Sequence, residues 1–144
     1  SLKVWSVADG QLQRSLGHHT EAVHALAFRP AGNGPATCAS AGDDRTVRLW
    51  QPEIGRMVRI VRKHHGPVLA LAWSPDGHQL FSAGQEGIIR RIDGDSDLIE
   101  QQWPSGPDWI YALAVSPDGT TLAAGDWSGT VRLHPLQTPE PEGP

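Results

Sequence analysis

One stretch of the sequence recurs at a nearly constant interval. Residues 46–50 read Thr-Val-Arg-Leu-Trp, and related stretches lie at residues 88–92 and 130–134. Trp50, Ile92 and His134 are 42 residues apart (92 − 50 and 134 − 92), and Trp5 lies 45 residues before Trp50. A fixed period in the forties is typical of repeat proteins in which each period is one supersecondary unit. This period constrains the fold more than any other feature of the chain.

Each period contains about four predicted strands separated by tight turns. The runs at residues 23–28, 68–73 and 110–115 are apolar on both faces, which predicts strands that are covered on both sides. Ser-Pro-Asp-Gly at residues 74–77 and 116–119 places Gly where a positive φ is expected. A sheet with two apolar faces must stack on neighbours, and radial stacking gives a propeller. We therefore predict an all-β fold, a partial β-propeller of four-stranded antiparallel blades.

The first complete repeat contains a histidine, a serine, an aspartate and a tryptophan at His19, Ser40, Asp44 and Trp50. Their order and spacing resemble the WD-repeat (WD40) β-propeller family, in which four such side chains form a buried hydrogen-bond network. The second repeat keeps two of the four residue types and the third keeps none; the corresponding positions are His64, Ser82, Glu86 and Ile92, then Gly106, Ala124, Ser128 and His134. The resemblance implies a complete network in the first repeat, a partial one in the second and none in the third.

The repeat pattern divides the chain into five segments. Residues 1–16 are expected to form the last two strands of a preceding blade, and residues 17–62 and 63–105 are expected to be WD repeats. Residues 106–136 are expected to form a repeat without its outer strand, and residues 137–144, rich in Pro and Glu, a disordered tail. The resemblance implies that these three and a half repeats are the C-terminal part of a larger ring. Bare blade faces would then favour self-association of the isolated chain.

Composition excludes several classes of function. The chain has 144 residues, a net charge of −4 and no cluster of Lys and Arg, so we expect no nucleic-acid partner. The longest apolar run, residues 68–73, is far shorter than a membrane span, so we expect no membrane partner. Cys38 is the only cysteine and cannot form an intrachain disulfide. A cytoplasmic location is the expectation.

Two groups of residues raise the question of catalysis or metal binding. Ser40, His19 and Asp44 have the atoms of a hydrolase triad, but Ser40 lies in a predicted central strand without a Gly-x-Ser-x-Gly elbow. The adjacent histidines at 18–19 and 64–65 lack a cysteine or a second carboxylate at metal-ligand spacing. We therefore expect no catalytic residue, no metal and no cofactor.

In the WD-repeat family, ligands contact the end of the propeller where the inner strands begin and where the second and third strands turn. The resemblance implies partner binding at the corresponding positions, which are His24, Leu69, Gln85, Trp109, Tyr111, Asp126 and Trp127. Exposed Trp and Tyr are favoured anchors at interfaces, although these aromatics could instead pack between blades. The predicted function is a non-catalytic scaffold that binds a protein or peptide. The alternatives are a sensor region of a larger enzyme, such as a kinase or nucleotide hydrolase, and a propeller hydrolase.

Overall fold

The computed structural model describes residues 1–32 and 34–136, and the regular structure in this part of the chain is entirely β-strand. The predicted tail at residues 137–144 lies outside the described residues. The thirteen strands are β1 (Leu2–Trp5), β2 (Leu12–Leu16), β3 (Val23–Phe28), β4 (Cys38–Gly42), β5 (Val47–Gln51), β6 (Arg56–Val61), β7 (Val68–Trp73), β8 (Gln79–Gly84), β9 (Ile88–Asp93), β10 (Ile99–Pro104), β11 (Ile110–Val115), β12 (Thr121–Asp126) and β13 (Val131–Pro135). Within these residues no helix exists that could span a bilayer.

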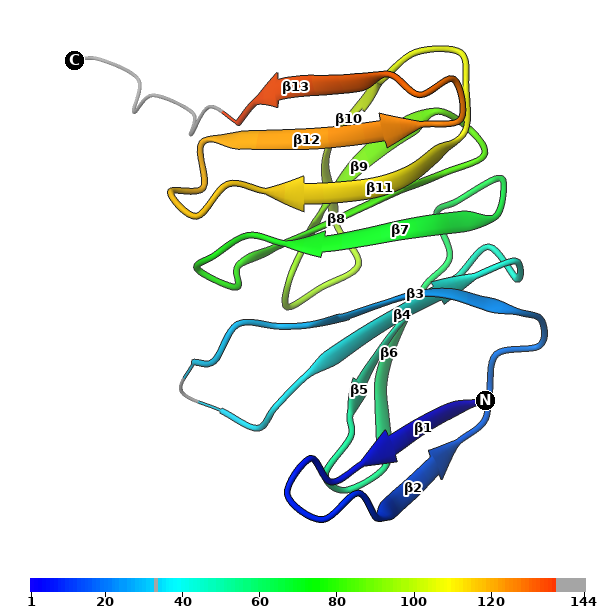
Figure 1. Cartoon of the computed structure of the whole chain (residues 1–144), viewed down its shortest axis with the longest axis vertical. Helices are drawn as coiled ribbons and strands as arrows, with labels where there is room; N and C mark the ends of the chain where they lie inside the picture. Colours follow the sequence, from blue (N-terminus) through cyan, green and yellow to red (C-terminus); the bar gives the residue numbers. More distant parts are fainter. Residues whose placement is uncertain (33, 137–144) are drawn as a thin grey trace.

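The strands form antiparallel sheets in which neighbours in sequence are neighbours in space. β1 and β2 form an N-terminal pair, β3–β6 the first sheet, β7–β10 the second sheet, and β11–β13 the three-stranded third sheet. Figure 1 shows the sheets following one another in chain order along the longest axis of the molecule. The predicted all-β, partial propeller architecture is confirmed, and the sheets do not close into a ring.

The strand registers repeat with the period of the sequence. In the first, second and third sheets, the residue at the repeated position pairs with an equivalent partner one strand inward: Trp50 with Cys38, Ile92 with Leu80, and His134 with Leu122. On the outward side, Trp5 pairs with Leu12 in the N-terminal pair as Trp50 pairs with Met57 in the first sheet. These four residues therefore occupy equivalent places in successive sheets.

Apolar side chains fill the space between each sheet and the next. Between the N-terminal pair and the first sheet the buried side chains are Leu2, Leu16 and Trp50. Between the first and second sheets they include Val47, Leu49, Leu71, Trp73 and Leu80, and between the second and third sheets Phe81, Ile89, Ile110 and Leu122. Since burying one such side chain contributes about 1.5–3 kcal/mol, each sheet depends on its neighbours for stability.

The prediction that all three inner strands are covered on both sides is correct only for β7, of which no residue is exposed. On β3, Leu26 and Phe28 are 58% and 64% exposed, because the two strands of the N-terminal pair pack against Trp50 and Val23 but leave these two side chains uncovered. In the third sheet, Val131 and Leu133 are both 68% exposed on the face turned away from the second sheet. The first and third sheets thus each present an open apolar face.

The turns follow the chemistry that the sequence predicts. Gly77 and Gly119, which end the two Ser-Pro-Asp-Gly turns, have φ values of 74° and 75°. In the turn between the second and third strands of each sheet, Gly87 and Gly129 also have positive φ, at 68° and 86°. The equivalent residue of the first sheet is Arg45, which has a φ of 63° and is the one non-glycine residue with positive φ in the described chain.

Candidate functional site

The structure brings together the four side chains of the network that the resemblance implies for the first repeat. Trp50 Nε1 donates to Ser40 Oγ at 2.8 Å, and Ser40 Oγ lies 2.7 Å from His19 Nε2. His19 Nδ1 lies 2.7 Å from Asp44 Oδ2. The indole N–H can only donate, so the serine hydroxyl donates to His19 Nε2 and His19 Nδ1–H donates to Asp44. Each of the four groups therefore has a partner of the right type.

The same geometry resembles a hydrolase triad, but its surroundings do not suit a nucleophile. Ser40 is 0% exposed and its oxygen already accepts the hydrogen bond from Trp50. Burial lowers the pKa of His19, and the neighbouring Asp44 carboxylate does not restore it. Burial raises the pKa of Asp44, but hydrogen bonds from Thr46 and His19 outweigh it, so the pKa lies below its usual value. The result is a neutral imidazole held against a carboxylate, an arrangement that pins the turn to the strands.

The second and third sheets hold their polar groups differently. In the second sheet, His64 Nε2 lies 2.7 Å from Ser82 Oγ, while Glu86 accepts two hydrogen bonds from Arg90. In the third sheet, His134 Nε2 lies 2.7 Å from Ser105 Oγ, a partner that sequence reasoning did not identify. Arg132 donates to Asp126 there, as Arg48 donates to Asp44 in the first sheet.

Sequence reasoning also missed these three arginine–carboxylate pairs. Their signal was present, because Arg48, Arg90 and Arg132 are 42 residues apart (90 − 48 and 132 − 90) and each interrupts an apolar strand. The carboxylates keep this spacing only in part: Glu86 follows Asp44 by 42 residues, whereas Asp126 comes two residues before the matching position, Ser128.

The predicted partner-binding positions lie at the ends of the sheets where the inner strands begin. Each inner strand carries a register shift there, between Val23 and Ala25, Val68 and Ala70, and Ile110 and Ala112. The extra residues are His24, Leu69 and Tyr111, one in each of three successive sheets. A β-bulge redirects a side chain out of the regular alternation, and bulges are over-represented beside functional sites.

A second repeated device holds the adjoining turn against each inner strand. The backbone N–H of Asp43, Gln85 and Trp127 donates to the carbonyl of the residue before the strand, at 2.9, 3.1 and 2.9 Å. Gly42 and Gly84 precede the first two of these residues, and a Cβ at either would come 2.0 Å from a carbonyl oxygen. Close backbone approach therefore explains these glycines. It brings each turn residue beside a bulge residue.

Six of these residues line a hollow of about 380 Å³, here called the rim hollow: His24, Asp43, Leu69, Gln85, Trp109 and Tyr111. The first sheet contributes the bulge residue His24 with Asp43, the second sheet contributes Leu69 with Gln85, and the third sheet contributes Tyr111 with Trp109. His24 Nε2 lies 2.7 Å from Asp43 Oδ1, with side chains 38% and 36% exposed. The structure thus gathers five of the seven predicted binding residues around one depression.

The aromatic side chains at the rim form a row. The rings of Trp109 and Tyr111 lie 6.3 Å apart and those of Tyr111 and Trp127 lie 5.9 Å apart, both tilted. Trp109, Tyr111 and Trp127 are 45%, 43% and 73% exposed, so they face solvent in the described chain. Large apolar rings in this state are available for a partner.

Asp126 lies apart from the exposed rim, although its position predicted binding. Its side chain is 3% exposed and receives hydrogen bonds from Ser128, Thr130 and Arg132. The hydrogen bond from Ser128 is the main reason that the pKa of Asp126 lies below its usual value. This carboxylate holds the turn that carries Trp127.

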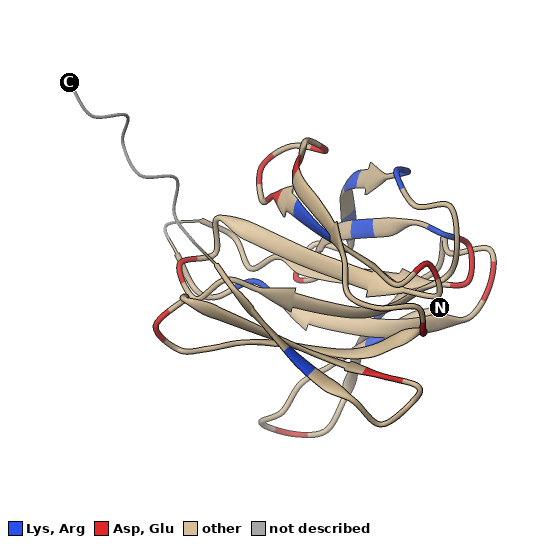
Figure 2. Ribbon diagram, turned by 90° about the horizontal axis from the view of Figure 1, so that it is seen from above, with Lys and Arg blue, Asp and Glu red and all other residues tan. Residues whose placement is uncertain are grey.

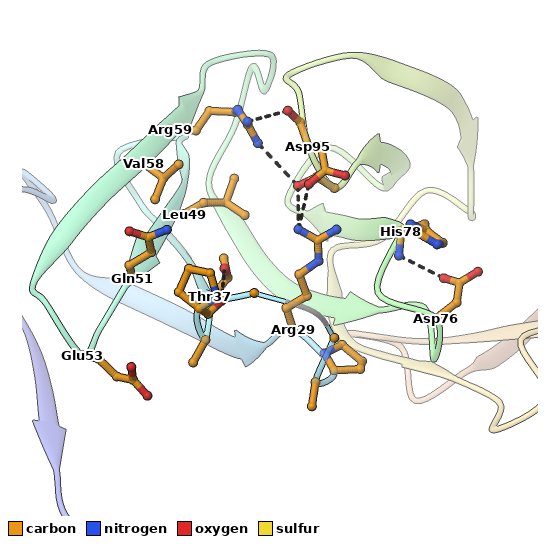
Figure 3. Close-up of a pocket in the computed structure, with 17 residues that line it drawn as sticks. Arg29, Thr37, Leu49, Gln51, Glu53, Val58, Arg59, Asp76, His78 and Asp95 are labelled. Carbon is orange, nitrogen blue, oxygen red and sulfur yellow. Dashed lines mark hydrogen bonds and ion pairs between the residues drawn. The ribbon is translucent and has the colours of Figure 1, made fainter.

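A larger hollow of about 710 Å³ lies at the other ends of the strands, between the first and second sheets (Figure 3). Arg29 and Arg59 point toward Asp95 there, as Figure 3 shows. Arg29 bonds to the Gly77 carbonyl and the Asp95 carboxylate, and Arg59 bonds to the Asp95 carbonyl. The guanidinium groups of Arg29 and Arg59, from the loop after β3 and from the first sheet, thus form hydrogen bonds to turns of the second sheet.

Charged residues are distributed over many loops and strands, and Figure 2 shows positions of both signs interspersed along the ribbon. The described residues contain no group of three or more His, Cys, Asp or Glu side chains placed to hold a metal ion. His18, one of the histidines considered for metal binding, instead stacks on Trp50 with ring centroids 6.0 Å apart.

Comparison with known proteins shows which family and which proteins this chain is similar to. The model of the family described as WD domain, G-beta repeat matches residues 10–51, 55–93 and 101–134. Small ribosomal subunit protein RACK1y of Oryza sativa subsp. japonica is 31% identical over 92% of this chain and 40% of its own length. WD repeat-containing protein 26 homolog of Arabidopsis thaliana is 30% identical over 92% of this chain and 22% of its own length.

WD repeat and SOCS box-containing protein 1 of Homo sapiens is 36% identical over 61% of this chain and 21% of its own length. The chain thus spans 40% or less of the length of each of these three relatives. More than half of each relative's own length therefore lies outside the match.

Proposed function

This chain belongs to the family of WD domain, G-beta repeats, and we propose that it is a non-catalytic scaffold that binds a protein or peptide at the rim. The rim is formed by the bulge residues His24, Leu69 and Tyr111 and by the turn and strand residues beside them. One observation carries the proposal: a device repeated in three sheets directs these side chains into one hollow, beside an exposed aromatic row. Exposed aromatic residues around a depression are typical anchors of protein interfaces.

The burial of Ser40 and His19 supports a role in recognition over a hydrolase. A substrate would have to reach Ser40 Oγ, which is 0% exposed and bonded to both His19 and Trp50. The rice relative is, by name, a small ribosomal subunit protein. A relative that is one component of a larger assembly supports the scaffold proposal for this chain. The lone, buried Cys38 is compatible with the cytoplasmic location we propose.

We also propose that these sheets form part of a larger ring. The open faces support this, since Leu26 and Phe28 on β3 and Val131 and Leu133 on β13 are between 58% and 68% exposed. In a propeller, such faces pack against further blades. When the chain is isolated, the same faces would promote self-association.

The rim can be tested with peptides selected from a displayed library on the intact chain. We expect the double variant Trp109→Ala, Trp127→Ala to weaken the selected peptides by roughly thirtyfold or more, because the loss of even one buried aromatic anchor costs about 2 kcal/mol. Dissociation constants from fluorescence anisotropy would measure this, after circular dichroism has shown that the variant is folded.

The matched control removes two exposed aromatics elsewhere. The variant Trp5→Ala, Phe28→Ala loses side chains that are 56% and 64% exposed, on β1 and β3. It should bind the selected peptides like the unmodified chain. Unchanged binding in the rim variant, or equal loss in both variants, would rule out the rim as the binding surface.

A further inference from the structure

We propose that the rim hollow binds the cationic side chain, lysine or arginine, of the partner peptide. This inference rests on the proposed function and adds the chemistry of the recognised group. Three features of the hollow carry it: an aromatic wall, a carboxylate oxygen with no partner among the described residues, and the absence of arginine or lysine among the six lining residues.

The aromatic wall is formed by Trp109 and Tyr111, whose rings are 6.3 Å apart and inclined by 38°. The face of an aromatic ring carries partial negative charge and attracts a cation placed over it, most strongly for tryptophan. Both residues line the hollow and are nearly half exposed, at 45% and 43%. An ammonium or guanidinium group that enters the hollow therefore meets ring surface from the third sheet.

The carboxylate comes from the first sheet. Asp43 Oδ1 is bonded to His24 Nε2 at 2.7 Å, and among the described residues Oδ2 has no hydrogen-bond partner. The side chain is 36% exposed, so Oδ2 can accept from a ligand. A cation between this oxygen and the rings would have a charge partner on one side and π faces on the other.

The rest of the lining suits the remainder of such a side chain. Leu69, from the second sheet, offers apolar surface for the alkyl stem of lysine or arginine. Gln85 supplies an amide that can bond to the peptide backbone. A volume of about 380 Å³ is small among ligand pockets, which run from about 300 to 1,000 Å³. It matches one long side chain and a short backbone segment.

The experiment compares three heptapeptides that differ only at the centre: Gly-Gly-Ala-X-Ala-Gly-Gly with X as lysine, arginine or norleucine. Norleucine has the alkyl stem of lysine without the charge. Peptides are titrated into the intact chain while the indole ¹⁵N–¹H signals of Trp109 and Trp127 are followed by NMR. We expect the lysine or arginine peptide to shift the Trp109 signal at a concentration at least about fivefold below that of the norleucine peptide.

Asp43→Asn is the matched variant, because it keeps the shape and the hydrogen bond to His24 while removing the charge. It should erase the preference for the cationic peptides, whereas Asp97→Asn, in the exposed turn between β9 and β10, should leave the preference unchanged. Trp109→Leu, followed at the remaining Trp127 signal, should weaken binding of the cationic peptides and leave norleucine binding nearly unchanged.

The outcomes separate this inference from the proposed function. Equal binding of all three peptides, or a preference that survives Asp43→Asn, would overturn the cation site and leave the rim intact as a peptide-binding surface. No shift at Trp109 with any of the three would also overturn the cation site. In that case the peptides selected from the displayed library still test whether the rim binds peptides at all. The relative strength of the lysine and arginine peptides identifies which cation the hollow prefers.

Discussion

The first and second sheets have the same strand order and register but hold their buried polar groups in different ways. In the first sheet, Trp50, Ser40, His19 and Asp44 form a closed chain of hydrogen bonds. In the second sheet, Ile92 replaces the tryptophan, and the histidine bonds to its serine alone. The backbone is nevertheless the same, so strand pairing and apolar packing are sufficient to define a blade. The polar network adds stability and order to that frame.

Each of these two sheets has one destabilising feature that the other lacks. In the described chain, His64 Nδ1 and Arg90 Nε of the second sheet are buried without a hydrogen-bond partner. A buried unpaired polar group costs about 1–3 kcal/mol. The first sheet satisfies the equivalent groups but carries Arg45 at a φ of 63°, where the second sheet has Gly87. The comparison therefore predicts different responses to mutation and to pH.

The largest difference should come from the tryptophan. Trp50 is 1% exposed and both fills the space beside the N-terminal pair and donates to Ser40. We expect Trp50→Ala to lower the free energy of unfolding by about 3–5 kcal/mol, as for other large core residues. Urea denaturation followed by circular dichroism would measure it. Trp5→Ala at the equivalent place, where the side chain is 56% exposed, should cost about 1 kcal/mol or less. Equal losses would refute the assignment of Trp50 to the core.

The next effect is a pH dependence that should be largest in the second sheet, because the pKa of His64 is lowered the most. Burial lowers the pKa of His64 from 6.5 to about 4, with a further contribution from Arg90. Between these two values the unfolded chain binds a proton that the folded chain does not, so stability falls as the pH decreases. We expect a stability contribution from His64 that is complete above pH 6.5 and falls by about 2–3 kcal/mol on acidification to pH 4.5.

The test for this effect is urea unfolding at pH 7 and pH 4.5 in the original chain and in His64→Gln, which can still bond to Ser82. The variant should lose the largest part of the pH dependence in this interval. His65→Gln, which changes the exposed neighbour, should keep it. A pH dependence that is the same in His64→Gln and in the original chain would contradict the interpretation of His64 as a buried neutral imidazole.

The sequence predicts those parts of the molecule that the repeat period specifies. Equivalent partners for Trp50, Ile92 and His134 follow from the spacing of 42, because a fixed period with fixed turns reproduces the register. The resemblance to the WD-repeat family, and not the spacing alone, implies which positions lie at the rim. Tyr111 and Leu69 are among the positions that it implies.

Other features depend on interactions between sheets and leave no local signal. The exposure of Leu26 and Phe28 depends on how far the N-terminal pair extends over β3, and apolar residues in a strand look the same whether or not they are covered. Asp126 was expected at the rim as a turn position, yet three hydrogen bonds from the turn and one from Arg132 on β13 hold its side chain. Ser105, which follows β10 of the second sheet, meets His134 on β13 of the third sheet only because the fold brings the two segments together.

The smallest effect concerns the strained turn of the first sheet. A non-glycine residue in the left-handed region destabilises the folded chain by about 1–2 kcal/mol. Glycine removes this strain, but it also raises the entropy of the unfolded chain, which offsets part of the gain in stability. We therefore expect Arg45→Gly to raise the free energy of unfolding by up to about 1 kcal/mol.

The reverse change is Gly129→Ala in the third sheet, where φ is 86° and an added Cβ meets no atom within 4 Å. It should lose about 1 kcal/mol from backbone strain alone. Urea denaturation of both variants would measure the two shifts with opposite signs. A loss of stability in Arg45→Gly would mean that the arginine side chain contributes more than its backbone costs, and the first sheet would then have no weakness at this turn.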